Sequence, residues 1–178
     1  MADREDLGAP ARRPPLHTLF LCTGNSARSI LAEALLREMG GERFVAHSAG
    51  SHPTGRVHPL ALELLSNRGL PVDGLRSKSW DEFARPQAPA LDLVITVCDN
   101  AAGEVCPVWP GHPATAHWGL PDPAAVTGDV AQRRVFAEVA HALSARIRLL
   151  TSLPVDRLDR RSLQRNLRAI ATPDADAA

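Results

Sequence analysis

The chain has 178 residues, of which 44% are hydrophobic, and this suits one domain with a real core. The chain has 20 basic residues (Lys and Arg) and 20 acidic residues (Asp and Glu). A net charge of zero argues against a general nucleic-acid or membrane-surface binder. No apolar run approaches a membrane span and the N-terminus lacks a secretory signal, so we expect a cytoplasmic protein with mostly reduced thiols.

The two ends of the chain are predicted to be mobile tails. Residues 1–15 are charged and rich in Pro and Ala, and residues 172–178 have a similar character. A single catalytic domain is therefore expected over residues 16–171.

Between the tails, apolar runs of strand length alternate with helical patterns. In chain order the predicted elements are a strand (16–22), a helix (28–39), a strand (43–49), a helix (58–69), a short helix near Trp80, a strand (91–98), a short helix from Cys98, a strand (114–118) and two helices (128–152 and 159–171). The predicted apolar face of the first helix comprises Ile30, Leu31, Ala34, Leu35 and Met39.

Strands that alternate with helices indicate a parallel sheet covered on both faces. The expected fold is therefore α/β, with three layers (α/β/α) and a four-stranded parallel sheet. Ligands of such sheets bind at the carboxyl ends of the strands. Cys22 and Cys98 both fall at such ends.

The segment CTGNSARS, residues 22–29, leads from the first strand directly into the first helix. Gly24 and Asn25 tolerate positive φ angles, so this loop can turn several backbone N–H groups inward and form an anion nest. The helix N-terminus adds donors, and Arg28 can grip two oxygens of a tetrahedral anion. The same field is expected to favour the thiolate of Cys22.

For Cys22 and Arg28 taken alone, a buried inert thiol and a surface charge are the plainer interpretation. The strand before the loop, the Gly-Asn inside it and the helix after it favour an anion site. Ser29 is placed to donate a hydrogen bond to the Cys22 sulfur.

The other two cysteines, Cys98 and Cys106, are separated by seven residues. Asp99 and Asn100 are good helix starters, so a short helix is expected to begin at Cys98. Two turns of intact helix would hold the sulfurs too far apart to bond, and Gly103 makes local unwinding easier. Spacing alone leaves two packed thiols as an alternative.

No metal site is predicted. Zinc held by Cys22, Cys98, Cys106 and His117 is conceivable, but the chain has no tight CxxC pair. The histidines show no ligand spacing and are interpreted as surface or loop residues: His47, His52, His58, His112, His117 and His141.

Four segments carry a resemblance to a known family: CTGNSARS (22–29), SAG (48–50), VCDNAAGEVCP (97–107) and HWGLPDP (117–123). Over residues 16–152 the chain resembles the low-molecular-weight protein tyrosine phosphatase superfamily, and within it the arsenate reductases built on that fold. The resemblance implies that Cys22 is the nucleophile. It also implies an oxyanion site formed by Thr23, Gly24, Asn25, Ser26, Ala27 and Arg28. Asn25, Glu33 and Ser48 resemble residues that hold a potassium ion in some relatives, but Trp80 stands where the fourth ligand, an Asp, is expected, so no metal is predicted there.

Asp122 lies between Pro121 and Pro123, which stiffen the backbone around it. By resemblance, Asp122 is the general acid that protonates the departing oxygen. Phosphatases of this family often have tyrosines beside that Asp to hold an aromatic substrate, and this chain has no tyrosine. A small inorganic substrate is therefore favoured, with Trp118 as a candidate wall of the site.

The resemblance further implies a disulfide relay from Cys22 to Cys98 and then Cys106. The predicted function is therefore an arsenate reductase that converts arsenate to arsenite for arsenic detoxification. No bound cofactor is expected, and phosphate or sulfate should compete with arsenate. The expected reductant is an external dithiol, thioredoxin first, with glutathione and glutaredoxin as the alternative. No nucleic acid or membrane partner is expected.

Two other functions stay open. The same loop supports a phosphatase that hydrolyses phosphomonoesters, but this function would leave Cys98 and Cys106 without a purpose. A non-catalytic redox or phosphate sensor would bind an anion without turnover, and Asp122 argues against it.

Overall fold

The computed structural model describes residues 13–104 and 107–172, and within them four parallel strands form one sheet. The strands, in the spatial order β2-β1-β3-β4, are β1 (Leu16–Cys22), β2 (Phe44–Gly50), β3 (Leu93–Thr96) and β4 (Ala114–His117). The predicted parallel sheet is confirmed. Most of the two predicted tails, residues 1–12 and 173–178, lies outside the described residues.

The register gathers the strand ends at one edge of the sheet. Cys22, the last residue of the central strand β1, pairs with Gly50 at the end of β2. On the other side, β3 ends at Thr96, which pairs with His117 at the end of β4. Strand β3 is shorter than predicted at this end because Cys98 already caps the next helix. The predicted location of a ligand site therefore coincides with a cluster of polar and thiol groups.

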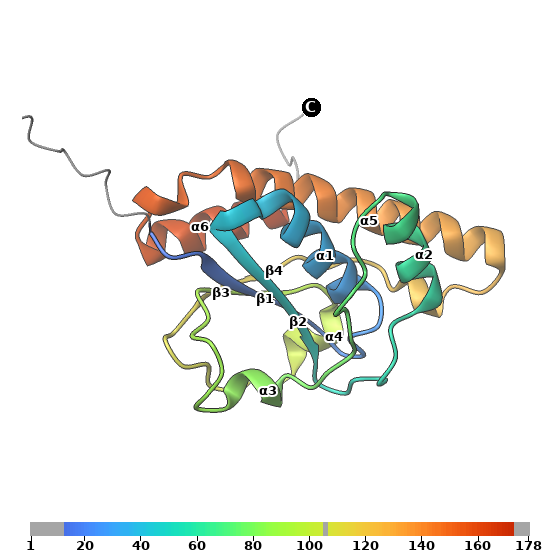
Figure 1. The fold of residues 1–178 in the computed structure, drawn as a ribbon, viewed down its shortest axis with the longest axis horizontal. Helices are drawn as coiled ribbons and strands as arrows, with labels where there is room; N and C mark the ends of the chain where they lie inside the picture. Colours follow the sequence, from blue (N-terminus) through green and yellow to red (C-terminus); the bar gives the residue numbers. More distant parts are fainter. Residues whose placement is uncertain (1–12, 105–106, 173–178) are drawn as a thin grey trace, which may run out of the picture.

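The helices are α1 (Arg28–Gly40), α2 (Pro59–Asn67), α3 (Asp81–Ala84), α4 (Asp99–Gly103), α5 (Asp129–Ser152) and α6 (Arg160–Ala171). Figure 1 shows α1, α5 and α6 along one face of the sheet and α3 on the other. The three-layer arrangement thus has one thick helical layer and a thinner one of α3 and loops. Among the described residues, no helix is both long enough and apolar enough to cross a membrane.

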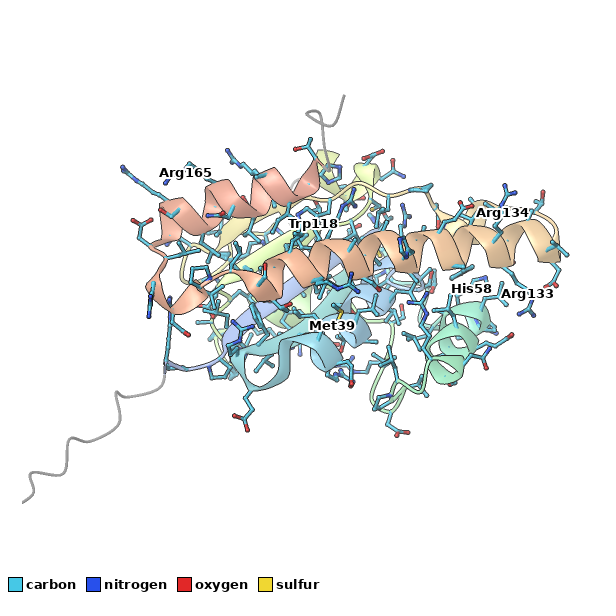
Figure 2. All side chains as sticks on the ribbon, turned by 90° about the horizontal axis from the view of Figure 1, so that it is seen from above. Met39, His58, Trp118, Arg133, Arg134 and Arg165 are labelled. Carbon is cyan, nitrogen blue, oxygen red and sulfur yellow. The ribbon has the colours of Figure 1, made fainter. Side chains whose placement is uncertain are left out.

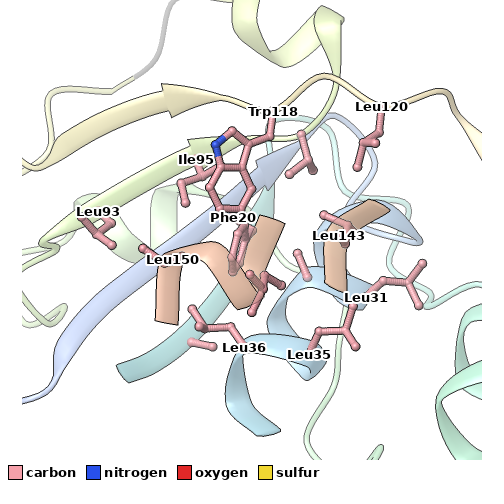
Figure 3. Close-up of a cluster of buried hydrophobic side chains, with 14 of the residues drawn as sticks. Phe20, Leu31, Leu35, Leu36, Leu93, Ile95, Trp118, Leu120, Leu143 and Leu150 are labelled. Carbon is pink, nitrogen blue, oxygen red and sulfur yellow. The ribbon is translucent and has the colours of Figure 1, made fainter. Parts of the chain in front are cut away.

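The larger core lies between the sheet and the thick helical layer (Figure 3). Phe20 of β1 faces Trp118, with ring centroids 6.2 Å apart. Trp118 is 0% exposed and donates from Nε1 to the carbonyl oxygen of Leu167 at 3.0 Å. The expectation that Trp118 forms a wall of the substrate site is therefore wrong, because this ring fastens the end of β4 to α6.

Helix α1 is buried on more sides than its sequence pattern predicts. Ala32, Glu33 and Leu36 are buried beside most of the predicted face, whereas Met39 is only partly buried. The reason is that α1 packs on β1 and β2 and also contacts α5 and α2. As a result, the Glu33 carboxylate is enclosed in the protein.

Helices α2 and α5 meet beside the end of the site loop. His58 caps the N-terminus of α2 by accepting from the backbone N–H of Leu60 at 3.1 Å, and its ring lies 4.8 Å from that of Phe136. Arg133 of α5 forms an ion pair with Glu63 of α2. Figure 2 shows His58 and Arg133 together where α2 and α5 meet.

Candidate active site

The loop from Cys22 to Arg28 wraps around the sulfur of Cys22. Cys22 Sγ accepts from the backbone N–H of Asn25 at 3.1 Å and lies 2.8 Å from Ser29 Oγ. Asn25 has a φ of 45°, so the predicted left-handed residue is present. Gly24 does not have a positive φ. A Cβ built at this position would lie 3.3 Å from Thr54 Cγ2, so the small side of glycine fits against Thr54.

The carbonyl groups of this loop point away from the sulfur. The oxygens of Thr23, Gly24 and Ser26 accept from backbone N–H groups of the segment 52–58 at 2.9, 3.0 and 2.8 Å. In a trans peptide the N–H of the next residue points opposite to the carbonyl. The N–H groups of Gly24, Asn25 and Ala27 are therefore turned toward the Cys22 side, which is the arrangement of an anion nest.

The loop was expected to lower the pKa of the Cys22 thiol and so favour the thiolate, but the pKa is raised. Burial raises the pKa above its ordinary value and outweighs the hydrogen bonds with Ser29 and with the N–H of Asn25, which lower it. Cys98 raises the pKa further. Arg28, whose charge was expected to favour the thiolate, is engaged with other groups.

Arg28 and Asp122 come together although they are far apart in the sequence. The Arg28 guanidinium lies 3.4 Å from Asp122 Oδ2 and donates to the carbonyl oxygen of Leu120 at 3.0 Å. Asp122 Oδ1 accepts from the backbone N–H of Ala124 at 3.1 Å, which fixes the carboxyl group. The Asp122 side chain is 44% exposed, so the carboxyl group is not enclosed in the protein.

The amide of Asn25 connects the loop to a buried polar network. Its Nδ2 donates to Ser29 Oγ at 2.9 Å and to Ser48 Oγ at 3.0 Å, and its Oδ1 accepts from the backbone N–H of Lys78 at 2.8 Å. Ser77 Oγ also donates to the carbonyl oxygen of Gly24 at 3.2 Å. Sequence reasoning missed Ser77 and Lys78, and no local signal marks them, because they reach the loop only through the fold.

Cys98 is buried next to the loop. Its Sγ lies 3.7 Å from Thr23 Oγ1 and accepts from the backbone N–H of Ala101 at 3.4 Å, so Cys98 caps α4 as predicted. The predicted short helix is present as α4, which ends at Gly103 with Glu104 extended, short of the two turns that would hold the sulfurs apart. Cys106 lies outside the described residues.

The interpretation of the histidines needs correction at one position, His47, whereas His117 is exposed as predicted. His47 lies within β2, where its ring stacks on that of His17 at 5.3 Å, and burial followed by His17 lowers its pKa to about 4. His117 lies at the end of β4, with Nε2 2.8 Å from Asp99 Oδ1 and Nδ1 2.8 Å from Thr96 Oγ1. Within residues 13–104 and 107–172, no group of three or more His, Cys, Asp or Glu could hold a metal ion.

These features define a class of protein: an anion nest with a cysteine at its base, an arginine at its end and an aspartate across from it. Residues 17–167 match the model of the low molecular weight phosphotyrosine protein phosphatase family, and the chain belongs to that family. Its relatives include arsenate reductases. One from Halalkalibacterium halodurans is 36% identical over 130 residues, which cover 72% of this chain and 90% of the relative.

Solved structures give the same picture. An arsenate reductase from Archaeoglobus fulgidus is 32% identical and has a TM-score of 0.56, with 73% of this chain and 98% of that chain covered. A thioredoxin-dependent arsenate reductase from Corynebacterium glutamicum is 31% identical, also with a TM-score of 0.56. That match covers 77% of this chain but only 60% of the Corynebacterium chain, which is the longer protein.

Proposed function

We propose that this protein is an arsenate reductase that converts arsenate to arsenite. The observation that carries the proposal is the meeting of two thiols at an anion nest: Cys22 lies at its base, and Cys98 touches Thr23 of the same loop. A phosphatase needs the first thiol alone. The similarity to arsenate reductases of several bacteria and an archaeon supports the same reaction.

In the first step arsenate binds the loop N–H groups and Arg28. Because burial favours the protonated thiol, the arsenate dianion accepts the Cys22 proton as the sulfur attacks arsenic. An As–O bond breaks, and Asp122 acts as the general acid that protonates the departing hydroxide, which leaves as water. Arg28 orients the anion by holding two oxygens. The product is a covalent Cys22–arsenic adduct.

The second step transfers the electrons. Cys98 attacks the Cys22 sulfur, and its thiol proton passes to the departing arsenite. The S–As bond breaks, arsenite leaves with that electron pair, and a Cys22–Cys98 disulfide remains. Cys106 then attacks Cys98, which releases the Cys22 thiolate and leaves a Cys98–Cys106 disulfide. An external dithiol, which we propose to be thioredoxin, reduces this bond. The relay needs a reducing compartment, so we place the protein in the cytoplasm.

The side chains around the site also favour a small substrate. The chain contains no tyrosine, and Trp118 is enclosed in the core. No tyrosine ring is therefore present to stack on the ring of a phosphotyrosine, and the Trp118 ring is not accessible to it. A tetrahedral inorganic anion needs only the nest, Arg28 and Asp122, so we propose arsenate as the substrate and phosphate and sulfate as competitors.

A coupled assay tests the proposal. Arsenate-dependent NADPH oxidation is followed with thioredoxin and thioredoxin reductase, and in parallel with glutathione, glutaredoxin and glutathione reductase. We expect turnover in the first system and loss of it in Cys22→Ser. Hydrolysis of p-nitrophenyl phosphate without arsenate reduction in either system would make the protein a phosphatase.

A further inference from the structure

The exposed side of α6 carries a row of positive charges. Arg161, Arg165 and Arg168 are exposed and follow one another at spacings of four and three residues, which places them on one face of the helix. We call these three side chains the arginine stripe. Figure 2 shows Arg165 on the outer side of α6. The opposite face is buried and consists of Leu163, Leu167 and Ile170. No residue of α6 is acidic.

In the described part of the chain, the arginine stripe forms no ion pair with an acidic residue. On α5, by contrast, Arg133 pairs with Asp129 at 3.0 Å. Arg134 pairs with Glu138 at 3.4 Å in the same way. Like charges at the spacings of the stripe repel one another. The stripe therefore costs some stability in the isolated chain, and an acidic surface placed against it would remove that cost.

An apolar hollow of about 420 Å³ adjoins the arginine stripe at Arg168, which lines it. Val108 stands between Pro107 and Trp109, which also line the hollow, and is itself 88% exposed. No other large hydrophobic side chain is as exposed in the part of the chain that the structure describes. An apolar patch with a charged rim is typical of a surface that contacts another protein.

The hollow lies beside the second and third thiols of the proposed relay. Ala101 lines it, and the backbone N–H of Ala101 donates to Cys98 Sγ at 3.4 Å. Pro107 lines it as well and directly follows Cys106 in the chain. A protein that reduces a Cys98–Cys106 disulfide therefore has to place its own cysteines next to the hollow, where it also meets Arg168.

Two contacts hold α6 in place relative to the hollow. Gln164 donates from Nε2 to the carbonyl oxygen of Thr115 at 2.6 Å and accepts from the backbone N–H of Thr115 at 2.8 Å. Trp118 Nε1 donates to the carbonyl oxygen of Leu167 at 3.0 Å. Because Thr115 also lines the hollow, the contacts with β4 keep the stripe and the hollow on one surface.

We propose that the hollow, Val108 and the arginine stripe form the docking surface for the protein dithiol that regenerates the enzyme. The surface calls for a partner whose cysteines are surrounded by apolar residues and rimmed by acids. The net charge of zero disfavours a nucleic acid or a membrane in this place. The inference rests on the proposed relay, which supplies the Cys98–Cys106 disulfide.

The docked partner exchanges two thiols for one disulfide. One partner thiolate attacks the Cys98–Cys106 bond and forms a mixed disulfide, and the second partner thiol then displaces the chain. The partner ends as a disulfide and the chain regains two thiols, so electrons and protons balance.

The test measures this exchange without arsenate. Diamide oxidises the protein, and peptide mapping locates the Cys98–Cys106 disulfide. NADPH oxidation with thioredoxin and thioredoxin reductase then gives kcat/KM for its reduction. Dithiothreitol reduces the same bond but is too small to use the docking surface, so it reports the disulfide alone.

The variants change the surface and leave the relay intact. Arg165→Gln, Arg168→Gln as a double variant removes two charges of the stripe, and Val108→Asp places an acid where the partner is apolar. Arg133→Gln, Arg134→Gln is the matched control, because it removes two charges from α5 and neither residue lines the hollow.

We expect the double stripe variant and Val108→Asp each to lower kcat/KM for thioredoxin about tenfold. Reduction by dithiothreitol should change less than about twofold, and the α5 control should behave like the parent. Added salt should narrow the difference between the parent and the stripe variant, since salt screens exposed charges.

The parent rate with thioredoxin in the stripe variant would overturn the inference, as would an equal loss with dithiothreitol. So would a stripe variant that keeps this rate but loses binding to a labelled DNA duplex or to phosphatidylglycerol vesicles. If thioredoxin does not reduce the parent, glutaredoxin with glutathione takes its place with the same expected outcomes. Reduction by neither protein would also overturn the inference.

The proposed function is judged separately. If the stripe variant slows thioredoxin but the natural protein fails to reduce arsenate, the docking surface stands and the substrate is wrong. If arsenate is reduced and the stripe variant behaves like the parent, the reaction stands and the docking surface is lost. A chain that forms no Cys98–Cys106 disulfide would overturn the relay and the docking surface together.

Discussion

At the scale of single residues, the groups that the Arg28 guanidinium contacts are central to the site. In the structure Arg28 faces Asp122 at 3.4 Å and the carbonyl oxygen of Leu120 at 3.0 Å. An oxyanion in the nest competes for the same guanidinium. In the proposed reaction we expect its arrival to free the Asp122 carboxyl group beside the leaving oxygen, which would couple anion binding to placement of the acid.

Arg28→Lys should weaken oxyanion binding, because an ammonium group cannot make the two-pronged contact. The loss of one charge-assisted hydrogen bond is worth about 1.5–3 kcal/mol, or roughly tenfold to a hundredfold in the inhibition constant of phosphate. Competition by phosphate in the arsenate assay measures it. Arg133→Lys, which alters an exposed ion pair on α5, is the control. An unchanged inhibition constant would place Arg28 outside the site.

Asp122→Asn should slow formation of the Cys22–arsenic adduct by about a hundredfold, since an amide cannot supply the proton at neutral pH. Anion binding should change little, because Asn keeps the acceptor that holds the N–H of Ala124. Single-turnover kinetics separate the two effects. Asp129→Asn, an exposed carboxylate at the start of α5, serves as control. Equal single-turnover rates for mutant and parent would argue that the proton comes from elsewhere.

At the scale of elements, α4 directly follows Cys98, the second thiol of the proposed relay. Helix α4 is a single short turn that Cys98 caps through Ala101 and that Asp99 ties to His117 of β4. Gly119 packs against this tie, since a Cβ there would lie 2.7 Å from Asp99 Oδ1. So short a helix, tied to β4 only through the exposed Asp99 among its described contacts with that strand, should open at small cost.

Cys106→Ser should allow roughly one turnover per chain and then stall as a Cys22–Cys98 disulfide, because the relay has lost its exit thiol. Cys98→Ser should fail earlier, at the Cys22–arsenic adduct. Peptide mapping by mass spectrometry after one equivalent of arsenate locates the disulfide in each variant. Hydrolysis of p-nitrophenyl phosphate should survive in both variants and so controls for folding of the site. Continued cycling of Cys106→Ser with thioredoxin at the parent rate would make Cys98 the thiol that the external donor attacks.

At the scale of the whole molecule, the sheet carries a pH-sensitive histidine, His47, between β1 and β2. His17 and His47 stack at 5.3 Å, and burial lowers the pKa of His47 to about 4 from 6.5. The unfolded chain binds a proton at this position between these two values and the folded chain does not. Stability contributed by neutral His47 is therefore present above pH 6.5 and is lost as the pH falls toward 4.

The free energy of unfolding in urea should fall between pH 7 and pH 5 by a part that His47→Gln abolishes. One proton sets an upper limit of about 1.4 kcal/mol per pH unit, and the half-buried position reduces it. His141→Gln, at an exposed position of α5, should leave the pH dependence unchanged. If the His47→Gln protein loses as much stability as the parent over this range, the acid sensitivity arises from other groups.

The sequence by itself determined the order of strands and helices along the chain and much of the character of the loop from Cys22 to Arg28. Local signals suffice for these, because alternating apolar runs fix the parallel sheet, Asp159 caps α6 through Ser162, and the loop residues are neighbours in the chain. The nearness of Cys22 and Cys98 was also predictable, since both follow strands whose carboxyl ends share one edge of the sheet.

Only the tertiary structure decided the charge and contacts of the site. Burial is a sum over distant segments, and it raises the pKa of Cys22 where the loop alone suggested the opposite. It also encloses Trp118 in the core and makes Glu33 an internal carboxylate. Lys78 reaches Asn25 across 53 residues of sequence, and Asp122 reaches Arg28 from beyond β4. Such contacts depend on how the segments pack in three dimensions, and no local pattern of residues records that.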